Sequence, residues 1–167
     1  MVKIWIKYLV LFVVVVLVQV LLLNQIQFSG YLNPYAYVLF ILLLRVSTPR
    51  NLVLILSFLL GLTIDIFSDT LGLHAAATTA LGFFRTPVIE LISLREEDQA
   101  NYPGLKQNGF KWFFLYATIL VLIHHFSLFF IDAFTLANFL KILARTLLSS
   151  AFSIFVIVLS QYMFFRE

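Results

Sequence analysis

Two aspartates and one histidine lie within ten positions near the middle of an otherwise very apolar chain. In a helix, Asp65 and Asp69 would share one face with Gly61, because successive members of the set are four residues apart. Such residues could serve an intramembrane aspartyl protease or a metal site. The aspartates lack the surrounding motif of such a protease. For His74, one turn into the next helix, an interfacial or hydrogen-bonded role is favoured over metal ligation.

A second group with chemical potential is the pair His124 and His125, in the stretch TILVLIHHFSLFFID. Adjacent helical residues point about 100° apart, so the pair is not expected to bind one metal ion. The sequence has no H-E-x-x-H motif, no Ser/His/Asp elbow, no phosphate loop and no G-x-G-x-x-G. It also has no cysteine, which excludes disulfides and thiolate metal sites. We therefore expect no enzymatic activity, no metal site and no cofactor.

Composition indicates what surrounds these residues. The chain has 167 residues, of which 62% are hydrophobic and only 11% are charged, against about 25% charged in soluble domains. Too few charges are present to cover a water-soluble surface, so we expect an all-α, polytopic integral membrane protein. Its length fits a single transmembrane helical domain, 1–167. The net charge of +3 is read as a signal of membrane orientation and not of nucleic-acid binding.

Six apolar segments are expected to form a six-helix bundle, since a spanning helix needs about 20 apolar residues. Two of them are short, and these are either tilted spans or together a re-entrant hairpin. No cleavage site follows the first segment, so it is expected to be a retained span and not a signal peptide. Pro87 is expected to kink the fourth segment or to end its regular part. The segments are 4–23, 35–44, 52–64, 71–94, 112–131 and 136–165.

The distribution of basic residues predicts the orientation in the cell inner membrane. With the N-terminus in the cytoplasm, the three outer loops (24–34, 65–70 and 132–135) contain no Lys or Arg. Cytoplasmic ends are rich in these residues, so both termini are expected to be cytoplasmic. Lys141 and Arg145 are exceptions near the outer end of the last segment. The basic residues assigned to the inner ends are Lys3, Lys7, Arg45, Arg50, Arg95, Lys106, Lys111 and Arg166.

Polar side chains at membrane depth must face protein or water, because an ionisable group there costs about 2.5–3.5 kcal/mol. Asp69 either caps a helix that begins near Thr70 or joins Asp65 in an internal network. The last segment carries a polar stripe within a wedge of about 120°, which is expected to face the bundle interior or a polar cavity. The stripe consists of Asn138, Lys141, Arg145, Ser149, Ser153 and Ser160.

Arg145 has two readings. It pairs with Asp65 or Asp132 inside the bundle, or it extends, like Lys141, to the outer headgroups. The predicted buried polar network or pocket comprises Asp65, Asp69, His74, His124, Arg145 and Ser149.

Small residues define a predicted packing surface. Gly72, Ala76 and Ala80 follow one another at four-residue intervals, and such a ridge lets a second helix approach closely in lipid. Gly61 belongs to the same expectation for the preceding segment. These four positions are predicted to contact a neighbouring helix, either of this chain or of a partner.

Several stretches resemble one known family. They are QVLLLNQIQFSGYLNPYAYVLFILLL, FLLGLTIDIFSDTLGLHAAATTALGFFR, WFFLYATILVLIHHFSLFFID and LLSSAFSIFVIVLSQYMFFR. The most characteristic element is G-x3-D-x3-D-x2-G, formed by Gly61, Asp65, Asp69 and Gly72. On these residues the chain resembles MreD, the rod shape-determining family, in its Bacteroidetes-type form. Arg45 departs from the family pattern, in which proline or a small residue is expected.

The resemblance implies a non-enzymatic subunit of the cell-wall elongation (Rod) complex, which maintains rod shape and organises peptidoglycan synthesis. Implied partners are MreC, the actin-like MreB, RodA and a class B transpeptidase, in addition to membrane lipids. The family is also similar in architecture to the S-components of energy-coupling-factor transporters, which implies an internal pocket. The alternative function is therefore a subunit that binds or transports a small solute or a lipid precursor.

Overall fold

The computed structural model describes residues 2–26, 33–93, 101–134 and 138–164. This described part is helical and contains no strand. One of its α-helices, α2, has only four residues. The elements are α1 (Val2–Leu21), the 3-10 turn η1 (Leu23–Gln25), α2 (Leu39–Leu42), α3 (Arg50–Ser68), α4 (Leu73–Ile92), α5 (Leu105–Ala133) and α6 (Phe139–Phe164).

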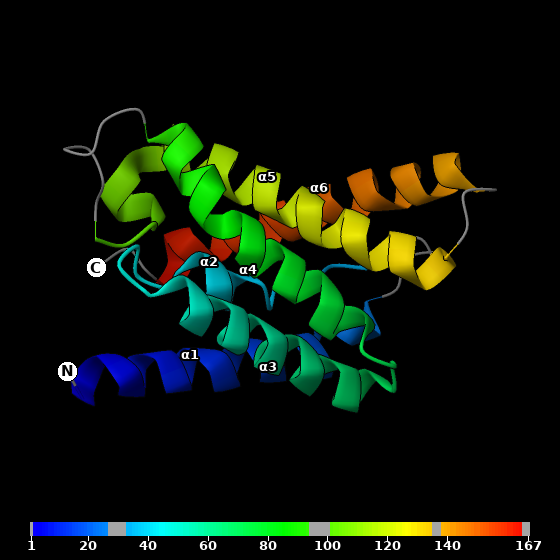
Figure 1. The fold of residues 1–167 in the computed structure, drawn as a ribbon, viewed down its shortest axis with the longest axis horizontal. Coiled ribbons are helices and arrows are strands. Elements are labelled where there is room, and N and C mark those ends of the chain that lie inside the picture. Colours follow the sequence, from blue (N-terminus) through cyan, green and yellow to red (C-terminus); the bar gives the residue numbers. More distant parts are fainter. Residues whose placement is uncertain (1, 27–32, 94–100, 135–137, 165–167) are drawn as a thin grey trace.

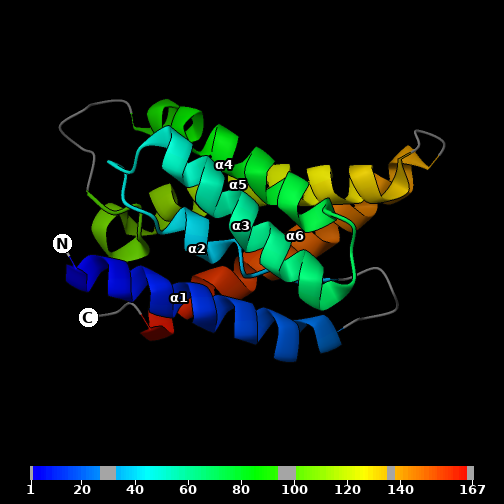
Figure 2. The ribbon, with the colours of Figure 1, turned by 60° about the horizontal axis from the view of Figure 1, so that its bottom comes forward.

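The long helices run up and down one bundle (Figure 1). Helix α1 begins and α6 ends at the same end of the bundle, here called the N-terminal end (Figures 1 and 2). At the opposite end, called the far end, α3 turns into α4 and α5 leads to α6. Helix α4 packs on both α3 and α5, and α5 packs on α6, while α1 packs mainly on α3.

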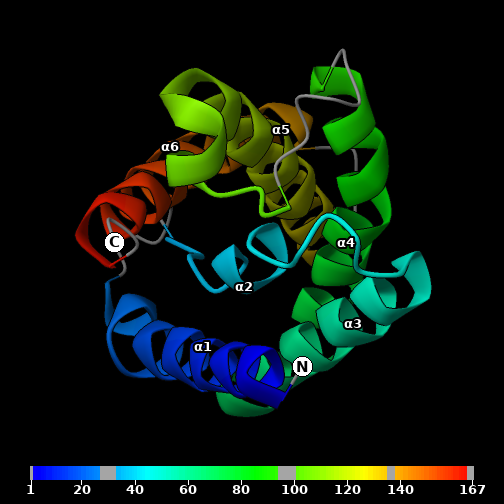
Figure 3. The ribbon, with the colours of Figure 1, turned by 90° about the vertical axis from the view of Figure 1, so that its left-hand side faces the viewer.

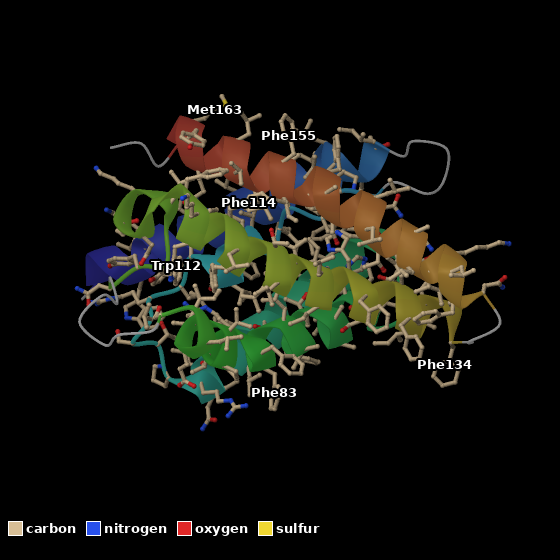
Figure 4. The ribbon with its side chains drawn as sticks, turned by 90° about the horizontal axis from the view of Figure 1, so that it is seen from above. Phe83, Trp112, Phe114, Phe134, Phe155 and Met163 are labelled. Atoms are coloured by element: carbon tan, nitrogen blue, oxygen red, sulfur yellow. The ribbon has the colours of Figure 1, made fainter. Side chains whose placement is uncertain are left out.

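Among the described residues, four helical stretches are long and apolar enough to cross a membrane: Trp5–Gln25, Arg50–Ser68, Leu105–Ala133 and Phe139–Met163. Helix α4, which corresponds to the predicted span 71–94, is not among them. Large apolar side chains also project from the outside of the bundle, as Phe83, Phe155 and Met163 do in Figure 4. A surface of this kind suits lipid far better than water. The expectation of an all-α membrane protein is therefore confirmed at this level.

The second predicted segment is the unusual part of the fold. Residues 33–44, here called the central segment, contain only the single turn of α2 and otherwise lack regular structure. The segment lies inside a ring formed by the five long helices (Figure 3). Its start contacts the far end of the bundle, where Asn33 lines a cavity with Asp69. Its end reaches the N-terminal end, where Arg45 contacts Tyr8.

This course decides between the two readings of the short segments. The segment 52–64 is part of the 19-residue helix α3, whereas 35–44 crosses the bundle in a mostly irregular conformation, so the two are not a re-entrant hairpin. Irregular backbone at membrane depth is tolerated only where protein surrounds it. That condition holds here, because every side chain from Ala36 to Leu44 is buried.

Other boundaries differ from expectation for local reasons. Helix α4 continues through Pro87 to Ile92, so the proline does not end it. Helix α5 starts earlier than predicted, at Leu105, but its first turn is separated from the rest by Gly109, whose φ is 79°. The long continuous part of α5 thus begins close to the predicted start at Trp112.

Helices α3 and α4 approach each other very closely at two glycines. A Cβ atom added to Gly61 would lie 2.5 Å from the Cα of Ala75, in the first turn of α4. Near the other end of the pair, a Cβ on Gly82 would collide with the Ser57 side chain. Gly61 was predicted to pack against a neighbouring helix, and its neighbour in the structure is α4.

Candidate functional site: a polar network around the central segment

The first half of the central segment is held by one glutamine of α1. Gln19 is fully buried, and its side-chain amide donates to the Pro34 carbonyl oxygen at 2.9 Å. Its carbonyl oxygen accepts from the backbone N–H of Ala36 at 3.0 Å and of Tyr37 at 3.4 Å. A helix would satisfy these backbone groups internally, but this part of the segment is not helical. The glutamine therefore supplies hydrogen bonds that the backbone cannot make with itself.

Two buried serines of α6 serve the same purpose. The backbone N–H of Asn33 donates to the Ser149 hydroxyl oxygen at 3.2 Å, and that of Tyr35 donates to the Ser153 oxygen at 2.8 Å. Both serines belong to the polar stripe predicted for the last segment. The buried part of the stripe therefore binds the backbone of the central segment.

At the N-terminal end, side chains of three helices bind the last residues of the segment. The Arg85 guanidinium, 1% exposed, donates to the carbonyl oxygens of Leu44 and Arg45. The Tyr116 hydroxyl donates to the Leu42 carbonyl oxygen at 3.1 Å. The Tyr8 hydroxyl oxygen accepts from the Arg45 N–H at 3.0 Å. The buried arginine is therefore stabilised by backbone carbonyl groups.

The side chain of Tyr37 joins the segment to α4 and α5. Its hydroxyl oxygen lies 2.9 Å from His74 Nδ1, 2.7 Å from His124 Nε2 and 3.2 Å from the Thr78 hydroxyl. All four side chains are buried. A hydroxyl group donates once and accepts twice, so these three contacts use its full hydrogen-bonding capacity.

Proton positions in the network follow from one backbone carbonyl. His125 Nδ1 lies 2.9 Å from the Val121 carbonyl oxygen, which can only accept, so this nitrogen carries a proton. For a neutral, fully buried ring, Nε2 is then an acceptor, and the Ser153 hydroxyl donates to it at 3.0 Å. The same serine oxygen accepts the N–H of Tyr35, so both roles of this hydroxyl are used.

The assignment continues through the second histidine. His124 Nδ1 lies 3.4 Å from Nδ1 of His125, whose one proton is directed at Val121. Two protonated nitrogens would repel each other at this distance, so the proton of neutral His124 is assigned to Nε2. That N–H donates to Tyr37, and the Tyr37 hydroxyl in turn donates to His74 Nδ1. Thr78 then donates to Tyr37. One consistent set of neutral tautomers therefore joins α6, α5, the central segment and α4.

Asp65 caps a helix from a distance. Its two carboxylate oxygens accept the backbone N–H groups of His74 at 3.0 Å and Ala75 at 2.8 Å, and Thr70 donates to it as well. These are orphan donors in the first turn of α4. The capping role considered for Asp69 belongs to Asp65. Asp69 is exposed in a left-handed conformation with φ 53° at the end of α3, so it lies outside the buried network.

A cavity of about 490 Å³ opens at the far end of the bundle. Asp69 borders it, and so does His74, whose Nδ1 is engaged with Tyr37. The histidine therefore links this cavity to the internal network. The remaining polar lining residues are Asn24, Gln25, Asn33, Tyr35, Ser68 and Thr70.

Arg145 pairs with Asp132 and not with Asp65. The charged atoms are 3.0 Å apart, and the side chains are 29% and 44% exposed. The guanidinium also lies 4.3 Å from the centre of the Phe129 ring. Lys141 is exposed. This end of the polar stripe thus lies at the edge of the bundle, because the central segment begins deeper, beside Ser149 and Ser153.

The small-residue ridge faces outward. Ala76 is exposed, and Gly72 and Ala80 are partly exposed, whereas α3 approaches α4 through Ala75 and Gly82. Gly72, with φ 80°, also forms the turn that starts α4. Within this chain the ridge therefore leaves room for a helix from elsewhere.

Sequence reasoning missed several residues of the network. Gln19 gave a readable signal, since it interrupts the run VVVVLVQVLLL near the middle of a span. Tyr37 and Thr78 gave none, because tyrosine and threonine are common in membrane helices. Arg85 was visible as a charge within a span, but its partners are backbone atoms, which a search for a carboxylate cannot find.

Within the described residues, no three His, Asp or Glu side chains are grouped to hold a metal ion. The fold and the network together define a helical membrane protein in which side chains of four helices, α1, α4, α5 and α6, hold an irregular crossing segment. Comparison of the chain with protein-family models, curated proteins and solved structures finds no match.

Proposed function

We propose that this chain is a non-enzymatic scaffold subunit of the MreD type. In this proposal it resides in the cell inner membrane with both termini in the cytoplasm, and it binds MreC through transmembrane helices. Through this contact it would take part in the elongation complex with MreB, RodA and a class B transpeptidase. The partner names come from the resemblance in the sequence, and the structure supports a scaffold role.

The outward ridge of Gly72, Ala76 and Ala80 carries this proposal. Close approach of helices in lipid requires small residues on the contacting face. Within the described residues, α4 packs on α3 through Ala75 and Gly82, so this internal contact does not involve the exposed ridge. An exposed strip of small residues on the outside of the bundle fits a partner's transmembrane helix.

The internal polar groups support the same conclusion. The carboxylate of Asp65 caps α4, and the two neighbouring histidines of α5 bind Tyr37 and Ser153. These groups are engaged in holding the central segment and the start of α4. Their arrangement provides a rigid frame and does not converge on a reacting substrate.

The test is co-purification of MreC with the full chain from detergent-solubilised membranes. Replacing Ala76 with Leu should reduce the recovered MreC about tenfold, since overpacking a close contact costs about 1–3 kcal/mol. Ala151, an exposed alanine on α6, provides the matched control, and Ala151→Leu should leave recovery unchanged. Equal recovery with both variants would contradict the use of the ridge.

A second candidate function rests on the far-end cavity. Its volume of about 490 Å³ lies within the range of small-molecule sites, roughly 300–1,000 Å³. Its polar lining fits a water-soluble ligand, as an S-component-like subunit would need. Thermal stabilisation of the purified chain by water-soluble vitamins, used as probes, would favour this function. Stabilisation that survives Ala76→Leu would separate it from the scaffold role.

A further inference from the structure

A larger cavity, of about 940 Å³, opens between α1 and α6. Helix α1 packs mainly on α3, and α6 packs on α5, so these two helices flank the opening while α2 lies between them (Figure 3). The central segment forms the back wall through Ala36, Leu39 and Leu43. The cavity is therefore a groove that reaches from the surface to the middle of the bundle.

The groove has the length of one lipid leaflet. On α1 its lining runs from Ile6 to Val18, which corresponds to about 18 Å along the helix axis. The hydrocarbon core of a bilayer is about 30 Å thick, so one leaflet contributes about 15 Å. On α6 the lining is confined to the half nearest the N-terminal end, at Val156, Ser160 and Gln161. A partner's spanning helix would need a groove along the full thickness.

The lining changes character at the N-terminal end. Lys7 of α1 and Lys106 of α5 both border the groove there and are exposed, and none of the described lining residues is acidic. Gln161 of α6 is 2% exposed. Its carbonyl oxygen accepts from the Leu105 N–H at 3.3 Å, but its buried Nε2 has no partner among the described residues. The groove that carries the two lysines is therefore also bordered by a residue with an unpaired donor.

We propose that this groove binds one anionic phospholipid from the leaflet at the N-terminal end of the bundle. An acyl chain would lie along α1 against Ala36 and Leu39, and the phosphate would lie between Lys7 and Lys106. The Gln161 amide would donate to a headgroup oxygen and so fill its open hydrogen bond. The apolar length, the paired cations and the unsatisfied donor each match one part of such a lipid.

Native mass spectrometry of the purified full chain in detergent tests the proposal. Dioleoyl phosphatidylglycerol is compared with dioleoyl phosphatidylethanolamine, which has the same chains but no net charge. We expect one phosphatidylglycerol to be retained in preference. Lys7→Gln and Lys106→Gln should each lower that preference about fivefold. Lys111→Gln, an exposed lysine of α5 outside the groove, should leave it unchanged.

A pair of tryptophan variants tests the apolar part. Val14 lines the groove and Val13 does not, and the two are 48% and 46% exposed. Val14→Trp should remove the retained lipid, whereas Val13→Trp should keep it. Because the lysines are exposed, their variants remain informative should Val14→Trp fail to fold.

Three results would overturn the proposal. The first is equal retention of the two lipids by the unmodified chain. The second is unchanged phosphatidylglycerol binding in both lysine variants. The third is lipid binding that survives Val14→Trp while co-purification of a partner membrane chain is lost, since that outcome makes the groove a helix-docking site.

Discussion

The Tyr37 hydroxyl oxygen lies 2.7 Å from Nε2 of His124, a residue 87 positions further along the chain. This contact joins the middle of the central segment to the middle of α5, in a region that is fully buried. It belongs to a set in which side chains of α1, α4, α5 and α6 bind that segment. The polar residues of this apolar protein are thus largely explained by one irregular crossing.

Removing the Tyr37 hydroxyl should destabilise the fold. Tyr37→Phe keeps the ring but leaves His124 Nε2–H, His74 Nδ1 and the Thr78 hydroxyl without their shared partner. A buried polar group without a partner costs about 1–3 kcal/mol, so we expect a loss in that range. The free energy of unfolding in mixed detergent micelles containing increasing sodium dodecyl sulfate would measure it.

The matched control for this variant is Tyr162→Phe, because Tyr162 is half exposed on α6. It should change the unfolding free energy by less than about 0.5 kcal/mol. Equal stability of the Tyr37 and Tyr162 variants would show that the assigned hydrogen bonds do not hold the segment.

Much of the fold could be predicted from apolar length alone. The positions of α1, α3, α5 and α6 follow from apolar runs that only lipid can accommodate. Because a spanning helix needs about 20 residues, each of these runs is long enough for one helix. The central segment could not be predicted in the same way. Its run from Tyr35 to Leu44 is as apolar as a short helix, and the irregular backbone of the segment depends on partners 15 to 118 positions away.

The candidate site was predictable in part for the same reason. Asp65, His74, His124 and Ser149 are recognisable as polar residues that lipid would reject, and the structure places each of them in a buried contact. What they bind could not be read from spacing, since their partners are mostly backbone atoms or the hydroxyl of Tyr37. Asp69 has the same residue type as Asp65 but follows the last turn of α3, so it points to the exterior.

Loss of the Asp65 carboxylate should weaken the start of α4. Asp65→Ala removes the acceptor of two backbone N–H groups, and loss of such a cap costs about 0.5–2 kcal/mol. Asp65→Asn keeps one acceptor oxygen and should lose less. Asp69→Asn provides the control for Asp65→Asn and should have little effect, since that side chain is exposed and Asn also tolerates the left-handed conformation of this position. Thermal unfolding of the purified variants in one detergent would rank them, and a larger loss at Asp69 would refute the assignment.

Gln19 should be indispensable to the course of the central segment. Gln19→Leu matches its size but leaves the Pro34 carbonyl and the Ala36 N–H buried without partners, at about 1–3 kcal/mol each. We expect the segment to loosen before the bundle unfolds. Because the chain has no cysteine, a single Cys at Ala36 can report this change through its rate of labelling by a water-soluble maleimide.

The control for Gln19 is Val13→Leu, which alters an exposed position of α1 outside the groove and touches no hydrogen bond. In the Ala36→Cys background it should leave the labelling rate near that of the parent. Faster labelling with Gln19→Leu and not with Val13→Leu is the expected pattern. Identical rates in the three proteins would mean that the glutamine is not what fixes the segment.

Arg85 and Arg145 should differ strongly in importance for stability. Arg85→Met removes charge-assisted bonds to two buried carbonyl groups, worth about 1.5–3 kcal/mol each. Arg145→Met breaks an ion pair whose side chains are 29% and 44% exposed. Such exposed pairs contribute at most about 1 kcal/mol to the free energy of unfolding. Unfolding in the same micelles compares them, and a loss at Arg145 equal to that at Arg85 would contradict the view that the central segment is the main element these buried polar groups support.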